Sequence, residues 1–152
     1  MVIDVSIRQA NRGDAEAISL IIVSALRASN AGDYSPEIIA RLEKNFDPQA
    51  IEALLEKRRV YVAFMSGHIV GTASLEASSV RTVFVAPEMQ GCGVGRRLLQ
   101  EIENTARIAG LPVLTVQSSV TAEPFYSKLG FTLVGDHYYG DERTILMQMS
   151  LI

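Results

Sequence analysis

Three glycines at alternate positions separate a β-branched run from a leucine-rich segment in VAPEMQGCGVGRRLLQEI, residues 85–102. They are Gly91, Gly93 and Gly95. Glycine inside an ordinary helix costs roughly 1 kcal/mol of stability per residue relative to alanine. Three glycines within five residues therefore indicate that the backbone of this segment must be free of side chains. The feature predicts a strand that leads into a helix through a loop whose amide groups are open to close approach.

The segments around this loop predict a strand, helix and strand crossover. RTVFV, residues 81–85, precedes the loop, and VLTVQ, residues 113–117, follows a helix that Gly110 and Pro112 end. The apolar residues of this helix recur at helical spacing: Val94, Leu98, Leu99, Ile102, Ala106 and Ala109. Such a crossover normally makes its two strands parallel.

The remaining strands predict antiparallel neighbours. RVYVAFM (59–65), HIVGTASLE (68–76) and VRTVFV (80–85) are joined by short turns, which is typical of a meander. A short strand at 6–9 and two strands from Phe131 onward complete the set. We therefore expect an α/β (α+β) fold with a mixed, mostly antiparallel sheet of about six or seven strands, flanked by helices.

Cap residues predict four further helices. Asp14 is the expected N-cap of a helix with an apolar face at Ile18, Ile21, Ile22, Ala25 and Leu26. Ser35 before Pro36 and Asp47 before Pro48 predict helices over 36–44 and 48–57. A short helix is expected over 121–129, with Thr121 as a cap.

Length and composition limit the classes of function. The 152 residues predict one domain, residues 1–152, with a core that needs no metal or disulfide. The single cysteine, Cys92, favours a reducing compartment, and the N-terminus lacks a signal-peptide pattern, so we expect a cytoplasmic protein without membrane contact. A net charge of -3 argues against a broad nucleic-acid surface.

The glycine loop is a candidate anion site. The first amides of a helix lack intrahelical partners, and the peptide dipoles add partial positive charge. Absent side chains at the glycines would let a pyrophosphate approach, although a tight turn alone also explains them. A Rossmann loop is excluded because Arg96 holds its third glycine position, and a Walker loop because no Gly-Lys-Ser/Thr follows.

Two motifs resemble the GNAT superfamily of acyl-CoA-dependent N-acetyltransferases. The segment from Gln90 to Gly95 resembles the family's Gln/Arg-x-x-Gly-x-Gly/Ala loop. AEPFYSKLGF, residues 122–131, resembles its A-x-x-FY-x-x-x-GF segment. The resemblance is strong from Val80 to Phe131 and weak before Arg59.

The resemblance implies where acetyl-CoA binds. The strand before the loop and the next parallel strand would splay, with the pantetheine arm bonded to the backbone of Val83, Phe84 and Val85. No metal is implied. The residues implied around the pyrophosphate and the rest of the cofactor are Gln90, Gly91, Cys92, Gly93, Val94, Gly95, Arg96 and, in place of a family asparagine, Ser119.

The resemblance also implies a general acid, Tyr126. The departing CoA thiolate needs a proton, and a phenol with a pKa of ~10 is a workable donor to a thiol near ~8.5. The neighbouring Phe125 is expected in the core. Glu76 and His137 are weaker candidates for the base that deprotonates the amine.

The acceptor is expected to be a small primary amine. Its walls are expected from 27–34 and 136–141, where Tyr138 and Tyr139 lie. A protein amine, a non-catalytic acyl-CoA sensor and a nucleotide-binding domain remain alternatives. A homodimer is among the expected oligomeric states of the acetyltransferase.

Overall fold

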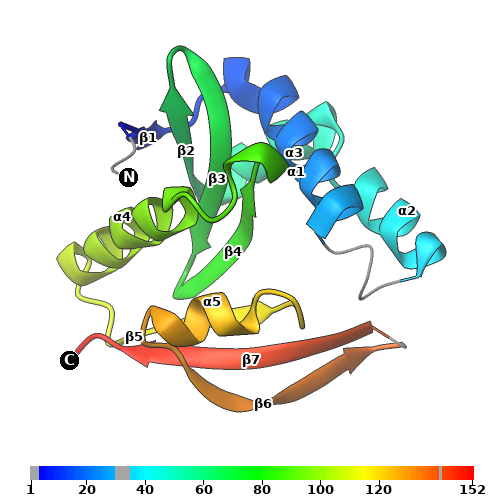
Figure 1. Cartoon of the computed structure of the whole chain (residues 1–152). Helices are drawn as coiled ribbons and strands as arrows, with labels where there is room; N and C mark the ends of the chain where they lie inside the picture. The colour runs from blue at the N-terminus through cyan, green and yellow to red at the C-terminus, as the bar shows by residue number, and fades with distance from the viewer. Residues whose placement is uncertain (1–3, 30–34, 141) are drawn as a thin grey trace.

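The computed structural model describes residues 4–29, 35–140 and 142–152 (Figure 1). In chain order, its strands (β), α-helices (α) and 3-10 helices (η) are β1 (Ser6–Gln9), η1 (Arg12–Asp14), α1 (Ala15–Ser29), α2 (Pro36–Lys44), α3 (Pro48–Lys57), β2 (Arg59–Met65), β3 (His68–Glu76), β4 (Ser79–Val85), η2 (Pro87–Met89), α4 (Val94–Ile108), β5 (Val113–Ser118), α5 (Glu123–Lys128), β6 (Thr132–Tyr139) and β7 (Glu142–Ser150).

The strands form a seven-stranded sheet in the order β1, β2, β3, β4, β5, β7, β6. Strands β1 to β4 are antiparallel neighbours, which confirms the predicted meander. Strands β4 and β5 are parallel, as the crossover through α4 predicts. Strand β7 pairs antiparallel with both β5 and β6. The predicted mixed, mostly antiparallel sheet is confirmed.

An apolar core lies on each face of the sheet, because successive residues of a strand point to opposite sides. On β2, Tyr61 and Ala63 belong to the core that α4 covers, and Val60 and Val62 belong to the core of α1 and α3. Figure 1 shows α4 on one side of the sheet and α1 on the other. The central strands are therefore covered on both faces.

The helix starts are confirmed in part. The side chains of Ser35 and Asp47 accept hydrogen bonds from the amides of Ile38 and Ala50, so they cap α2 and α3 as predicted. The caps are completed by Pro36 and Pro48 in the first helical turn.

The predicted N-cap at Asp14 is wrong. Asn11 is the cap of η1, which runs into α1, and Asp14 is the third residue of a reciprocal capping box: its Oδ2 accepts a hydrogen bond from the Asn11 amide at 2.8 Å. Asp14 also receives two hydrogen bonds from Arg8, at 2.8 and 2.9 Å. The helical path starts earlier than predicted because Asn11 supplies the first half of the box.

A helix long and apolar enough for a bilayer crossing does not occur within the described ranges.

Candidate active site

Strands β4 and β5 are paired only at their N-terminal ends. Their register joins Ser79 to Thr115 and Val80 to Val116, and the described strands part beyond these pairs. The predicted splay of the parallel pair is therefore confirmed. It leaves the later part of β4 without a strand partner on the β5 side.

An irregularity in β4 accompanies the parting. Thr82 has a φ of +53°, and the register between β3 and β4 shifts nearby. A β-branched residue rarely adopts this conformation, which costs on the order of 1–3 kcal/mol. Ser74 Oγ donates a hydrogen bond to the Arg81 carbonyl at 2.8 Å, and Arg58 Nη1 donates one to Thr82 Oγ1 at 2.9 Å. These bonds hold the strand in its strained form.

A cavity of about 920 Å³ lies where the strands part. Its volume is near the upper end of the ~300–1,000 Å³ range of small-molecule sites. Helices α1 to α3 and their connections contribute one part of its lining: Ala25, Leu26, Leu42, Asn45, Phe46, Leu54 and Arg58. Strands β4, β5 and β7, the glycine loop and the α5 region contribute the rest. The cavity therefore joins the two halves of the chain.

The three glycines of the loop have two different structural roles. Gly91 and Gly93 have positive φ angles of +77° and +92°, and a Cβ on either would meet open space. Gly95 is helical and buried, and a Cβ there would lie 3.1 Å from Phe125. Two glycines therefore allow the turn, and the third allows α4 to approach Phe125.

The start of α4 has the features of an anion site. Gly93 is its N-cap, so no side chain bonds the first amides, and the first turn contains no acidic residue. Those amides have no intrahelical acceptor. They open onto the cavity, because Gly93, Val94, Gly95 and Arg96 all line it.

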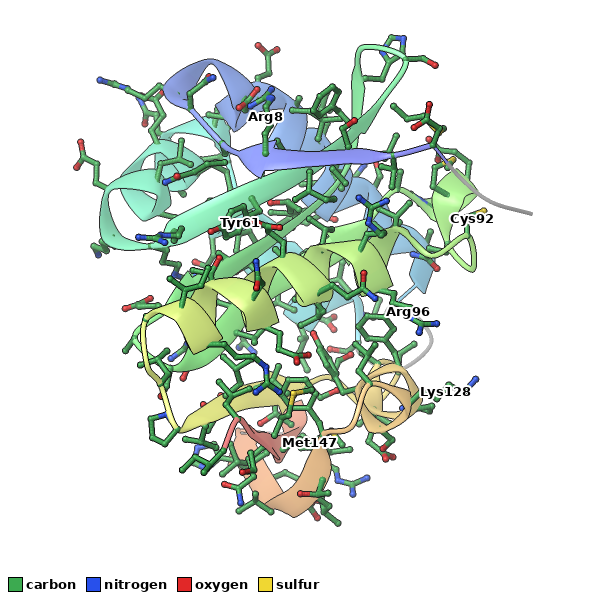
Figure 2. The ribbon with its side chains drawn as sticks, turned by 90° about the vertical axis from the view of Figure 1, so that its left-hand side faces the viewer. Arg8, Tyr61, Cys92, Arg96, Lys128 and Met147 are labelled. Carbon is green, nitrogen blue, oxygen red and sulfur yellow. The ribbon has the colours of Figure 1, made fainter. Side chains whose placement is uncertain are left out.

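Most of the predicted cofactor residues line this cavity. They are Val83, Phe84, Val85, Gln90, Gly91, Gly93, Val94, Gly95, Arg96 and Ser119. Cys92 is not among the lining residues. In the view of Figure 2, Arg96 lies in the first turn of α4, between the loop that carries Cys92 and helix α5.

Tyr126 is buried but faces the cavity. Its ring makes edge-on contacts with Phe125 and Phe131, at centroid distances of 5.0 and 5.5 Å. Within the described part of the chain, its hydroxyl makes no hydrogen bond, yet no fully buried side-chain polar atom there is unsatisfied. The hydroxyl is therefore reachable from the cavity. Burial raises the pKa of Tyr126, which keeps the phenol protonated.

The two candidate bases do not line the cavity. Glu76, at the end of β3, accepts a hydrogen bond from Arg58 Nε at 2.7 Å, so Arg58 lies between it and Thr82. His137 is exposed on β6, and its carbonyl accepts a hydrogen bond from Thr144. Neither side chain is placed beside Tyr126 by these contacts.

The segment before α5 differs from its prediction. Helix α5 begins at Glu123 and has no side-chain cap, so the expected cap at Thr121 is wrong. Ser119 Oγ instead accepts a hydrogen bond from the Ala122 amide at 3.2 Å, because the chain turns two residues before Thr121. Thr121 itself lines the cavity.

Sequence reasoning missed Arg58 and Gln117 as lining residues. Arg58 lies between a helix and a strand and has no motif around it. Gln117 is the last residue of a predicted strand. The expected splay of the neighbouring strand was the signal that could have placed Gln117 in the cavity lining.

A family model for the acetyltransferase (GNAT) domain matches residues 30–151. The chain therefore belongs to the GNAT family of acetyltransferases. The uncharacterized N-acetyltransferase YafP of Escherichia coli K12 is similar to it, with 30% identity over 131 residues, which cover 86% of this chain and 83% of YafP.

Solved structures of the family have the same fold. A GCN5-related N-acetyltransferase of Rhodopseudomonas palustris superposes with a TM-score of 0.93 and 25% identity, over 99% of this chain and 98% of that one. The PaiA N-acetyltransferase of Thermoplasma acidophilum, in complex with coenzyme A, gives a TM-score of 0.84 at 18% identity, over 97% and 99% of the two chains.

Proposed function

We propose that this protein is an acetyl-CoA-dependent N-acetyltransferase that moves an acetyl group to a small primary amine by direct attack. One observation carries the proposal. One cavity is lined both by the start of α4, with its open amides, and by Tyr126, whose hydroxyl makes no hydrogen bond to a described residue. The structure of PaiA with coenzyme A and the name of YafP support the choice of cofactor and reaction.

In this proposal the pyrophosphate binds the first amides of α4. The amides and the helix dipole favour an anion, and Arg96 adds a positive charge at the cavity wall. Gln90 shapes the loop, since its Nε2 donates to the Val85 carbonyl at 3.3 Å. The pantetheine arm then runs back along Val85, Phe84 and Val83 toward Thr82. Ser119 also lines the cavity.

The thioester therefore lies near Thr82, and the reaction follows from that position. The amine nitrogen attacks the carbonyl carbon, a C–N bond forms, and the C–S bond breaks. The thiolate sulfur takes the phenolic proton of Tyr126. The attacking nitrogen releases its proton to solvent, and the Tyr126 phenolate recovers a proton from solvent. Burial that raises the pKa of the phenol also disfavours a thiolate in the same cavity, so the proton transfer stays feasible.

The other assignments stay predictions. Glu76 remains the candidate base, although its Oε1 already bonds Arg58. The small-molecule acceptor, the lack of metal and nucleic-acid partners, the cytoplasmic location and the homodimer are expectations from the sequence.

The test is release of free CoA thiol from acetyl-CoA with a panel of small amines. We expect release that depends on the amine and yields the N-acetyl product. Tight binding of acetyl-CoA without transfer to any amine or to any protein amine would support a sensor instead.

A further inference from the structure

The part of the cavity that α1 to α3 form has an apolar wall. Leu26, Leu42 and Leu54 come from the three helices. Phe46, after α2, and Phe84, on β4, complete it with ring centroids 6.1 Å apart at 64°. This wall suits an apolar group of the acceptor rather than a strongly hydrated one.

A fixed guanidinium borders this wall. The side chain of Arg58 is 15% exposed, its Nε donates to Glu76 at 2.7 Å, and its Nη1 donates to Thr82 at 2.9 Å. Arginine has five N–H donors, and the described contacts use two. No fully buried polar atom in the described part of the chain lacks a partner, so the Arg58 nitrogen without a described partner, Nη2, is not fully buried. Arg58 itself lines the cavity.

Arg58 also lies at the reacting end of the cavity. Its partner Thr82 immediately precedes Val83, where the pantetheine arm ends in the proposed cofactor position. The pyrophosphate loop is at the opposite end of that arm. A group bound to Arg58 is therefore beside the acetyl group, not beside the phosphates.

The charges of the lining favour an anionic group there. Its described ionisable residues are Arg58, Arg81, Arg96 and Tyr126, with no aspartate or glutamate. Glu76 pairs with Arg58 from outside the lining, and Arg81 is a further positive charge on β4. A purely cationic amine would meet repulsion in such a site.

We propose that Arg58 binds the carboxylate of the acceptor, so that the acceptor is a small amine with a carboxylate and an apolar group, as in an apolar amino acid. This proposal rests on the proposed acetyltransferase function. The free edge of a guanidinium matches a carboxylate in two parallel hydrogen bonds. Glu76 and Thr82 hold the guanidinium in place, so little side-chain freedom is lost on binding.

The same positive charge assists the attack. An amine reacts only when it is neutral, and nearby positive charges lower the pKa of its ammonium form. Arg58 and Arg81 therefore favour the reactive form of a bound amino acid, while the carboxylate offsets the repulsion during binding.

The test compares acceptors that differ only in the acid group. Phenylalanine and leucine are each assayed with acetyl-CoA beside their amides and their decarboxylated amines, 2-phenylethylamine and 3-methylbutylamine. We expect the wild type to prefer the amino acids. The R58Q variant should lower kcat/KM for them roughly ten- to a hundredfold, mainly through KM, and should remove the preference.

Two variants control this result. Arg59 is the exposed neighbour of Arg58 and does not line the cavity, so R59Q makes the same change in charge and should leave every acceptor unaffected. R58K keeps a positive charge beside Glu76 but lacks the planar guanidinium. Its kcat/KM for the amino acids should therefore lie between the values for wild type and R58Q. Melting temperature and acetyl-CoA affinity, measured for each variant, show that the protein is folded and the cofactor site intact.

Failure of this proposal is distinct from failure of the proposed function. Equal use of acids and decarboxylated amines, or an equal loss of both in R58Q, overturns the role of Arg58 while acetyl transfer stands. Absence of acetyl-CoA binding overturns the proposed function itself. Calorimetry with CoA and each amino acid needs no turnover, and lack of any binding by the wild type also overturns the carboxylate site.

Discussion

The two sides of the cavity are built in different ways. The side proposed for the cofactor, residues 80–131, relies on backbone: two glycines with positive φ, the open amides of α4 and the unpaired part of β4. The side proposed for the acceptor, from α1 to α3 and Arg58, relies on side chains that three helices bring together. Backbone recognition requires particular residue types at particular spacings, and therefore leaves a motif. A wall of leucine and phenylalanine side chains tolerates exchange of one apolar residue for another, so it leaves no motif in the sequence.

The largest effect is expected from Y126F on the cofactor side. Loss of the hydroxyl should lower turnover by ~10² to 10⁴, toward the lower value because a thiolate is a fair leaving group. Stability and acetyl-CoA affinity should hardly change, since the ring contacts remain. Rates are measured across pH under conditions where chemistry limits turnover.

Y61F is the matched control for that variant. The Tyr61 hydroxyl bonds Thr105 Oγ1 at 2.7 Å and does not line the cavity. Its loss should cost about 1 kcal/mol of stability and leave turnover unchanged. Full activity of Y126F would show that Tyr126 has a purely structural role.

Acetyl-CoA itself should stabilise the protein by about 2.7 kcal/mol at a hundredfold excess over its Kd. For a chain of this size the melting temperature then rises by roughly 5–10 °C. NAD and ATP should produce no such rise. Hydrogen exchange should slow at the glycine loop and in β4 and less in α2 and α3, and protection confined to the helices would contradict the assignment of the two sides.

Gly93 and Gly95 divide the cofactor side further. G93A forces alanine into a φ near +92°, at a cost of about 1–2 kcal/mol, and its Cβ enters the open space expected for the phosphates, so acetyl-CoA affinity should fall. G95A presses on Phe125 at 3.1 Å and should cost about 1–3 kcal/mol by overpacking.

G93A and G95A should therefore change different properties of the enzyme. Because Phe125 contacts Tyr126, G95A should lower turnover more than cofactor affinity. Denaturant melts, calorimetry and steady-state rates separate these outcomes. Equal changes in affinity would mean that both glycines face the cofactor alike.

The smallest effect is expected at Asp14, which does not line the cavity. Hydrogen bonds from Arg8 lower the pKa of Asp14, so its stabilisation is present above the unfolded pKa, near ~3.9, and is lost as pH falls through the lower folded value. D14N should cost on the order of 1 kcal/mol near neutral pH, because the capping box is lost and the partly exposed Arg8 is screened by water.

Urea unfolding from pH 7 to pH 2 measures this effect. The difference between wild type and D14N should shrink below about pH 4, and acetyl-CoA affinity should match wild type. A difference that is constant with pH would show that the Asp14 charge contributes nothing.

How far each side could be predicted follows from how it is built. The crossover, the meander and the glycine loop follow from local periodicity and from residues with special backbone freedom. The Gly95 contact with Phe125 and the position of Arg58 depend on segments far apart in the chain. Asp14 was misassigned because one polar residue can begin a capping box or end it. The residues next to Arg58 in the sequence do not indicate that its side chain contacts Thr82.

The parting of β4 from β5 has a consequence for the cofactor. Beyond Ser79 and Val80, β4 lacks hydrogen bonds to a strand on its β5 side, and an extended molecule with amide groups can supply them. Pantetheine is such a molecule. In the proposed enzyme the cofactor would act as a temporary strand, so each catalytic cycle would complete the sheet and open it again.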